Sequence, residues 1–260
     1  MSSRSKQKEE ARAKREADEK NRQHSDKRRQ RLWLLGGTAL VAVVVVVALV
    51  LVSSGGKSEG GDSSKIQGAT DIEAMLKGVP QQGQALGETT APVTLVEYAD
   101  LQCPFCAEFA DNVLPHLVQD YVRAGKLRII LQPLTFIGPD SERAARMSLA
   151  SGQQGKLWNY SELFYRNQGE EKTGYADDAF LISIGKAIPG LDYNKAMASM
   201  GDASITKALA GAAAEAQRAG FNSTPSFEIG LTGKAAKPLS ISKLEPDQFN
   251  AEIDKLLGGK

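Results

Sequence analysis

The sequence predicts an α/β domain, interrupted by a block of helices, that follows a single transmembrane helix and a charged N-terminal tail. Three observations predict this arrangement. Residues 32–52 contain no charged side chain, residues 92–125 follow the pattern of a strand and then a helix, and residues 138–220 follow the pattern of several helices. Strand and helix patterns therefore alternate along the chain, which is typical of α/β domains.

The charged tail comprises residues 1–31. It holds twelve Lys or Arg and six Asp or Glu, and no apolar pattern that could form a core. Residues 32–52, "LWLLGGTALVAVVVVVALVLV", are long enough for a helix to cross about 30 Å of hydrocarbon. Only a helix satisfies every backbone group of a single segment in lipid. A cleaved signal peptide is the alternative, but its apolar region would run for only about 7 to 15 residues.

The distribution of charge predicts how the chain is oriented at the cell membrane. Because positively charged flanks stay inside, we expect a cytoplasmic N-terminus, one membrane crossing and an extracytoplasmic C-terminal part. Residues 53–69 form a Gly/Ser-rich linker. Residues 70–260 form the folded domain, which is long enough for one good core.

Residues 92–100, "PVTLVEYAD", are β-branched and apolar, and predict a buried strand. Apolar positions then recur at helical spacing and predict a helix that ends at Gly125. Cys103 falls at the N-terminus of this helix, with Pro104 in its first turn, where the missing N–H costs nothing. The positive end of the helix dipole would lower the pKa of a thiol in this position. Cys106, one turn further along, is expected to be buried and to keep a higher pKa.

The two cysteines of the chain form one C-x-x-C pattern, which has three interpretations. A zinc site needs four ligands, usually Cys or His, and the chain has only two His, one of them in the tail. We therefore expect no metal and no cofactor. A structural disulfide that closes a loop of about four residues would contribute only about 2 kcal/mol. A redox-active pair is favoured, because a strand precedes it, a helix follows it and the compartment is oxidising.

The segment between the cysteine pair and the last strands is mostly helical. A strand at 126–134 comes first, and four helical patterns end at Gly or Pro breaks, at 141–152, 155–168, 176–188 and 203–220. A strand at 226–230, a short strand at 238–241 and a helix at 245–257 complete the domain. The acidic pairs at 170–171 and 177–178 are interpreted as solvated caps at helix starts.

The segment "VTLVEYADLQCPFC" resembles the active site of the DsbA-like thiol-disulfide oxidoreductases, a branch of the thioredoxin superfamily that includes membrane-tethered BdbD-type proteins. The likeness extends over about residues 70–257. It implies a thioredoxin fold with a helical insertion at about 138–220 and a catalytic pair, Cys103 and Cys106. Glu97, six positions before the first cysteine, matches a buried acidic residue of the family with a proton-relay role. The alternative is a Glu at the edge of the strand that faces water.

A second segment, "NSTPSFEIG" at 222–230, resembles the family's cis-proline loop. The resemblance implies that Thr224 and Pro225 lie against the cysteine pair, and that Thr224 pairs with an extended substrate. Pro104 and Phe105 would add apolar contact. Phe105 departs from the family, because the strong oxidants have a histidine between their cysteines.

The resemblance implies an enzyme that donates its Cys103–Cys106 disulfide to reduced or unfolded exported proteins. It also implies reoxidation by a quinone-linked membrane partner of the DsbB or vitamin-K-epoxide-reductase (VKOR) type. Two alternatives remain open, namely a reductase or isomerase with the same site and a membrane-tethered chaperone or binding module without a redox role. We expect contact with the lipid bilayer through residues 32–52 and no nucleic-acid partner.

Overall fold

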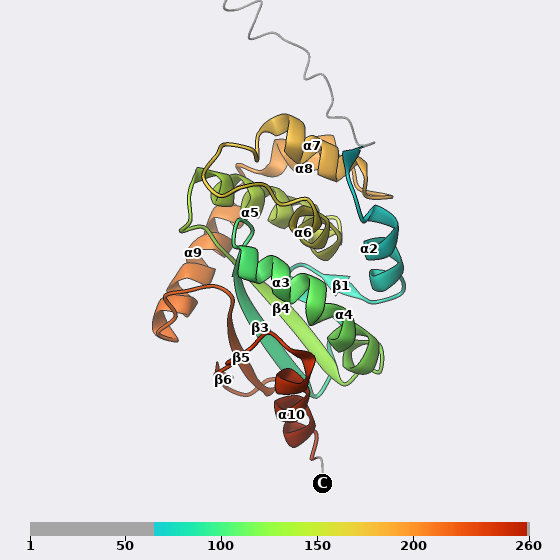
Figure 1. Cartoon of the computed structure of the whole chain (residues 1–260), viewed down its shortest axis with the longest axis vertical. Coiled ribbons are helices and arrows are strands. Elements are labelled where there is room, and N and C mark those ends of the chain that lie inside the picture. Colours follow the sequence, from blue (N-terminus) through green and yellow to red (C-terminus); the bar gives the residue numbers. More distant parts are fainter. Residues whose placement is uncertain (1–64, 259–260) are drawn as a thin grey trace, which may run out of the picture. The chain divides into compact units, whose positions relative to one another are not determined.

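A six-stranded sheet organises residues 65–258, the part of the chain that the computed structural model describes (Figure 1). Its strand order is β1 (Gln81–Gln82), β2 (Ala85–Leu86), β4 (Leu127–Leu134), β3 (Val93–Asp100), β5 (Ser226–Leu231) and β6 (Lys237–Leu239). β3 and β4 run parallel, and every other neighbouring pair is antiparallel. The parallel pair therefore forms the centre of the sheet.

The predicted tail (1–31), the predicted transmembrane helix (32–52) and most of the linker (53–69) lie outside the described residues. Their structure and the orientation at the membrane stay predictions. Within residues 65–258, no helix is both long enough and apolar enough to cross a bilayer.

Strand β3 is buried on both of its faces. Side chains alternate along a strand, and Val93, Leu95 and Ala99 are fully buried in the larger core, on the side covered by α3 (Pro104–Asn112). Tyr98, on the opposite side, packs with Leu134 and with two alanines of α9 (Ala203–Arg218) in a smaller core. The strand predicted at 92–100 is confirmed, together with its burial.

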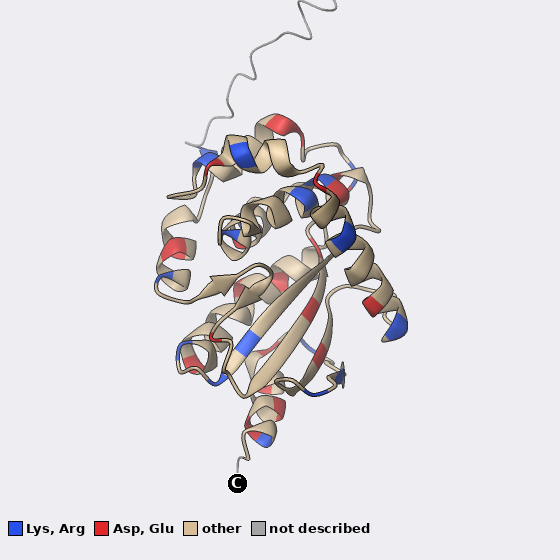
Figure 2. Cartoon of the chain, turned by 180° about the vertical axis from the view of Figure 1, so that it is seen from behind, with Lys and Arg blue, Asp and Glu red and all other residues tan. Residues whose placement is uncertain are grey.

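Polar side chains cross the second face of the sheet. The Tyr98 hydroxyl donates to Oε2 of Glu228 at 2.6 Å, and Nε2 of Gln132 donates to Oε2 of Glu215 in α9 at 2.9 Å. In the rear view of Figure 2, acidic and basic positions are interspersed along the strands and helices of this side. The second face is thus held by polar contacts between its elements as well as by apolar packing.

Helices fill the segment between β4 and β5. They are α5 (Pro139–Gly152), α6 (Leu157–Arg166), α7 (Asp178–Lys186), α8 (Tyr193–Ser199) and α9. In the view of Figure 1, α5 to α8 gather above the sheet. The four predicted helices are confirmed, and α8 is additional. α2 (Ala69–Leu76) precedes the sheet, and α10 (Pro246–Leu256) confirms the predicted last helix.

The helix predicted from the cysteines to Gly125 is interrupted, so that prediction of a continuous helix is wrong. α3 ends at Asn112, α4 (Leu114–Leu117) follows, and a π-helical turn spans Val118–Val122. The cause is Pro115, which has no N–H to donate to the carbonyl four residues earlier and whose ring crowds that carbonyl. Gly125, at φ +66°, ends the segment as predicted.

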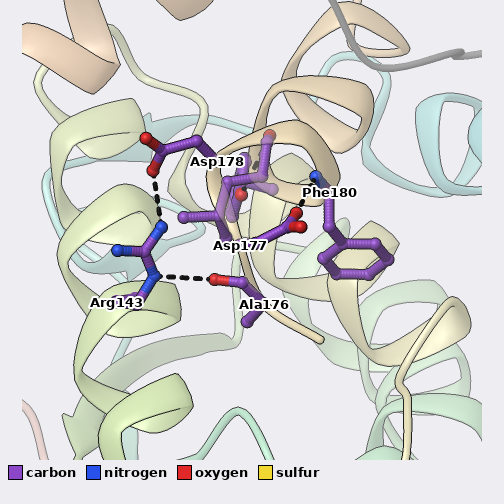
Figure 3. Close-up of polar contacts among 7 residues, drawn as sticks. Arg143, Ala176, Asp177, Asp178 and Phe180 are labelled. Atoms are coloured by element: carbon purple, nitrogen blue, oxygen red, sulfur yellow. Dashed lines mark hydrogen bonds and ion pairs between the residues drawn. The ribbon is translucent and has the colours of Figure 1, made fainter. Parts of the chain in front are cut away.

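The acidic pair at 177–178 caps α7, whereas the pair at 170–171 does not cap a helix. Oδ1 of Asp177 accepts from the backbone N–H of Phe180 at 2.8 Å, and Asp178 forms an ion pair with Arg143 of α5 (Figure 3). Nε of Arg143 also donates to the carbonyl of Ala176 at 2.8 Å. Residues 170–171 are exposed in the loop after α6. These contacts join the start of α7 to α5.

We expect Asp177→Ala to lower the free energy of unfolding by about 1 kcal/mol, because it leaves an N-terminal N–H of α7 without its acceptor. Asp178→Ala is the matched control. It removes an exposed ion pair, and we expect a loss of no more than about 0.5 kcal/mol. Urea denaturation of the two variants measures both values. Equal losses would contradict the capping role of Asp177.

Candidate active site

Glu97 lies in β3 on the face that packs against α3. It shares this face with Val93, Leu95 and Ala99 because side chains alternate along the strand. Only 2% of Glu97 is exposed, and its Oε1 accepts no hydrogen bond from residues 65–258. The alternative of a strand-edge Glu that faces water is therefore wrong. A buried carboxyl without a full set of partners is held more easily in its neutral form.

Cys103 occupies the N-cap position of α3, and Pro104 is the first residue of the helix, as predicted. The Cys103 N–H donates to the carbonyl of Asp100 at 2.9 Å, which fixes the turn between β3 and α3. Cys103 is 5% exposed, Cys106 is completely buried and Phe105 is 60% exposed. Cys103 therefore keeps a small exposed area, whereas Cys106 has none. The ring of Phe105, between the two cysteines, protrudes into solvent.

The loop before β5 lies against Cys103. β5 pairs antiparallel with β3, so that Ser226 is opposite Tyr98 and the preceding loop lies at the same end of the sheet as Cys103. Sγ of Cys103 donates to the backbone carbonyl of Thr224 at 3.3 Å, and the Thr224–Pro225 peptide bond is cis. Thr224 thus contacts the sulfur of Cys103, although the two residues are 121 positions apart in the chain.

The two thiols have opposite pKa shifts. A hydrogen bond from the Cys106 thiol is the main cause that lowers the pKa of Cys103 to about 6, although burial opposes it. The Thr224 side chain and the backbone N–H groups of Cys106 and Phe105 lower it further. Burial is the main cause that raises the pKa of Cys106 well above its ordinary value. With these pKa values, Cys103 is mainly a thiolate near neutral pH, which is the reactive form of a thiol, and Cys106 retains its proton.

Glu97 is coupled to this pair. Burial raises the pKa of Glu97 to about 8, and the negative charge of the Cys103 thiolate raises it as well. The charge of Glu97 in turn raises the pKa of Cys106. A carboxyl that ionises near neutral pH can both accept and return a proton within one catalytic cycle.

An open groove of about 710 Å³ lies beside the contact between Cys103 and Thr224. Its lining includes Phe105, Thr224 and Pro225, together with residues 239–245 before α10. Pro104 is not among its lining residues. The residues that line the groove provide both polar groups and apolar side chains.

Sequence reasoning missed the polar groups that hold the site in place. Nε2 of Gln168, just after α6, donates to the carbonyls of Leu101 and Cys103 at 2.7 and 3.1 Å. The carboxylate of Asp100 accepts from the N–H groups of Gln102 and Ile137 at 2.9 and 3.2 Å. Asp100 could have been suspected from its place between the strand and the cysteine, but no local pattern indicates Gln168.

The structure brings together five of the predicted site residues, namely Glu97, Cys103, Cys106, Thr224 and Pro225. Phe105 stands beside them at the rim of the groove. Between residues 65 and 258, no cluster of three or more His, Cys, Asp or Glu side chains is arranged to bind a metal ion. The chemistry available at this site is exchange between thiols and disulfides.

A sequence profile of the thioredoxin family matches residues 80–254. The chain is 29% identical over 177 residues to the probable disulfide bond formation protein D of Bacillus cereus. The matched region covers 67% of this chain and 78% of that protein. Its fold is similar to that of BdbD from Bacillus subtilis, with a TM-score of 0.59 and 21% identity over 70% of this chain and 98% of that chain.

A thioredoxin-like oxidoreductase from Silicibacter pomeroyi is also similar, with a TM-score of 0.55 and 27% identity over 68% of this chain and 92% of that chain. The predicted thioredoxin fold with a helical insertion is confirmed by these matches and by the observed topology. The chain therefore belongs to the thioredoxin family, as a DsbA-like thiol-disulfide oxidoreductase that is similar to BdbD.

Proposed function

We propose that this enzyme donates its Cys103–Cys106 disulfide to exported proteins that are reduced or unfolded. The observation that carries the proposal is the position of Cys103 at the start of α3, where a hydrogen bond from the Cys106 thiol and the backbone N–H groups of Cys106 and Phe105 stabilise its thiolate. Stabilising the thiolate favours the reduced enzyme, which makes the disulfide more oxidising. Similarity to proteins named for disulfide bond formation supports the same direction.

The first step is attack by a substrate thiolate on Sγ of Cys103. A bond forms between the substrate sulfur and Cys103, and the bond between Cys103 and Cys106 breaks. Cys106 leaves with the electron pair, and the buried position of its sulfur makes the thiolate unfavourable there. The protonated carboxyl of Glu97 supplies the proton that Cys106 needs.

The second step releases the oxidised substrate. A second substrate thiolate attacks the substrate sulfur of the mixed disulfide, and Cys103 leaves as a thiolate. Two substrate thiols lose two electrons and two protons, and the enzyme disulfide becomes one thiolate and one thiol. The low pKa of Cys103 makes it a good leaving group in this step.

The groove beside Cys103 is the proposed site for the substrate chain. An extended segment could pair with the backbone at Thr224 while Phe105, exposed at the rim, contacts its apolar side chains. Such contacts depend little on sequence, which suits a substrate class of many unfolded chains. Pro104 contributes to the exposed surface near Phe105.

The proposed location is the outer side of the cell membrane. Residues 32–52 would anchor the enzyme in the bilayer, with residues 1–31 in the cytoplasm, and residues 53–69 would tether the catalytic domain. A quinone-linked membrane protein of the DsbB or VKOR type would reoxidise the dithiol. Protease added to intact cells is expected to digest the domain and to spare the tail, and the opposite pattern would contradict this topology.

The reduction potential decides the direction of electron flow. We expect a potential well above the value of about −270 mV that is typical of thioredoxin. Equilibration of the full chain in glutathione buffers, followed by alkylation of free thiols, measures it. A value near that of thioredoxin would instead support a reductase or isomerase. This alternative stays open because Phe105 takes the place of the histidine that the strong oxidants of the family have between their cysteines.

A further inference from the structure

In the described part of the chain, three charged side chains line the groove beside Cys103, and their charges do not cancel. They are Glu108 of α3, and Lys243 and Glu245 from the segment before α10. Nζ of Lys243 lies 3.7 Å from Oε1 of Glu245. Among the described lining residues, Lys243 is the one cation, and it already faces a carboxylate. The charge that is left over is the negative charge of Glu108.

Glu108 has no partner of opposite charge within residues 65–258. No Lys, Arg or His side chain of this range forms an ion pair with it. The other acidic residue of α3, Asp111, pairs with Arg166 at 3.0 Å, Oδ1 to Nη2. Glu108 is also exposed to solvent. Its carboxylate is therefore available to a cationic group that enters the groove.

The helix places Glu108 near the reactive end of the groove. Phe105 and Glu108 are three positions apart in α3 and lie on one face of it, whereas Cys106 and Phe109 are buried on another. With a rise of about 1.5 Å per residue, Glu108 lies about 7.5 Å along the helix axis from Cys103. An extended chain rises about 3.3 Å per residue, so this distance corresponds to about two or three residues of a bound substrate.

The other contacts proposed for the groove do not depend on charge. Phe105 offers an exposed apolar ring, and the backbone at Thr224 can pair with any extended segment. Glu108 adds a group that attracts a cation and repels an anion. A charge at the edge of a binding surface acts mainly on the choice of partner and on the rate of association.

We propose that Glu108 selects substrate segments that carry a Lys or Arg close to the reacting cysteine. The substrate thiolate attacks Sγ of Cys103, while a cationic side chain two or three positions before or after that cysteine faces the Glu108 carboxylate. Glu108 exchanges no proton or electron with the substrate, so it acts on binding and leaves the exchange step unchanged. The inference rests on the proposed function, because it names the class of substrate segments that the same groove prefers.

The test measures how fast the oxidised full chain oxidises short dithiol peptides at low ionic strength. Each peptide has two cysteines joined by a flexible Gly/Ser spacer, and Lys, Gln or Glu stands two positions from each cysteine. Quenching with acid and alkylation of the remaining thiols gives the second-order rate constant. The ratio of the rate with the Lys peptide to the rate with the Glu peptide is compared between variants. The effect of a neighbouring charge on the peptide's own thiol cancels in this comparison.

We expect Glu108→Gln to lower this ratio about fourfold, because it removes an attraction and a repulsion that are each about twofold for an exposed charge pair. Glu108→Lys is expected to lower the ratio about fourfold again, because attraction and repulsion then exchange places. At about 1 M salt, where the Debye length is about 3 Å, the ratios of the wild type and both variants are expected to converge. A purely structural role would change the rates with all peptides by the same factor and leave the ratio constant.

Glu88→Gln is the matched control, because it also removes one exposed carboxylate and changes the net charge by the same amount. Glu88 follows Gly87, which lies close to Leu127 at the start of β4. β3 and β4 run parallel from this end of the sheet toward the cysteines, so Glu88 is far from the groove. We expect the wild-type ratio in Glu88→Gln. Equal falls in Glu88→Gln and Glu108→Gln, or a wild-type ratio in Glu108→Lys, would each overturn the inference.

The Gln peptide separates failure of the preference from failure of the proposed function. If the wild type oxidises this neutral peptide while the ratio stays the same in every Glu108 variant, the proposed function stands and the selection by Glu108 is wrong. If the wild type oxidises no peptide faster than oxidised glutathione does at the same concentration, the chain is not a disulfide donor. The preference of the groove then fails with the proposed function.

Discussion

Replacing Cys103 with Ser is expected to abolish the oxidation of reduced, unfolded proteins by this enzyme. A serine oxygen cannot form or exchange a disulfide, and it does not ionise near neutral pH. The position at the start of α3 stabilises a thiolate, so the replacement removes both the sulfur and its activation. Recovery of activity by a reduced, unfolded substrate enzyme, with oxidised full chain as the only oxidant, measures the effect. We expect the recovery to fall to the uncatalysed background.

Cys106→Ser is the informative control. It also lacks a disulfide to donate, but it keeps Cys103 and removes the thiol that would resolve a mixed disulfide. We expect this variant to accumulate a stable mixed disulfide with glutathione, whereas Cys103→Ser forms none. If Cys103→Ser still protected or assembled its substrates as well as the wild type, the chain would be acting as a chaperone or binding module. If Cys106→Ser formed no adduct, Cys103 would not be the nucleophile.

Local patterns were enough to predict the centre of the site. β3 has a dense apolar and β-branched sequence, and Pro104 marks the start of α3, so Cys103 could be placed at a helix N-terminus. The contact between Cys103 and Thr224 spans 121 positions, and only the resemblance to a family indicated it. The catalytic and binding roles of the predicted site residues stay predictions, although the structure brings most of them together.

Features that depend on tertiary packing could not be predicted. β1 and β2 have two residues each, too few to show an alternating pattern, and they exist because they pair with each other and with β4. Glu162 has no local signal, since a Glu on a helix is usually exposed. It is buried because α6 packs against both α3 and α5. The apolar pattern of the helix continues past Pro115, so the pattern alone does not indicate the break that this proline causes.

The stability of the reduced enzyme is expected to rise with pH, relative to the Cys103→Ser variant, between about pH 6 and pH 9. The folded protein lowers the pKa of Cys103 from 9.0 to about 6. A depressed pKa contributes stability that is fully present above the unfolded value and is lost as the pH falls through the folded value. Three pKa units correspond to a difference of up to about 4 kcal/mol at the alkaline end.

Glu97 works in the opposite direction. Its pKa is raised to about 8, so its contribution is fully present below about pH 4.5 and is lost as the pH rises through 8. The Cys103 thiolate is one cause of that shift, so in Cys103→Ser the loss is complete at a lower pH and is smaller. The difference in stability between wild type and Glu97→Gln, measured over the same pH range, gives the contribution of Glu97 and so separates it from that of Cys103.

Urea unfolding of the reduced proteins, followed by circular dichroism from pH 5 to pH 9, measures these differences. The oxidised wild type is the control, because Cys103 has no ionisable thiol in the disulfide and the rise with pH is expected to disappear. A difference between wild type and Cys103→Ser that stays constant from pH 6 to pH 9 would show that folding does not stabilise the thiolate. The disulfide would then lose the physical reason to be a strong oxidant, since Cys103 would leave no more readily than an ordinary cysteine.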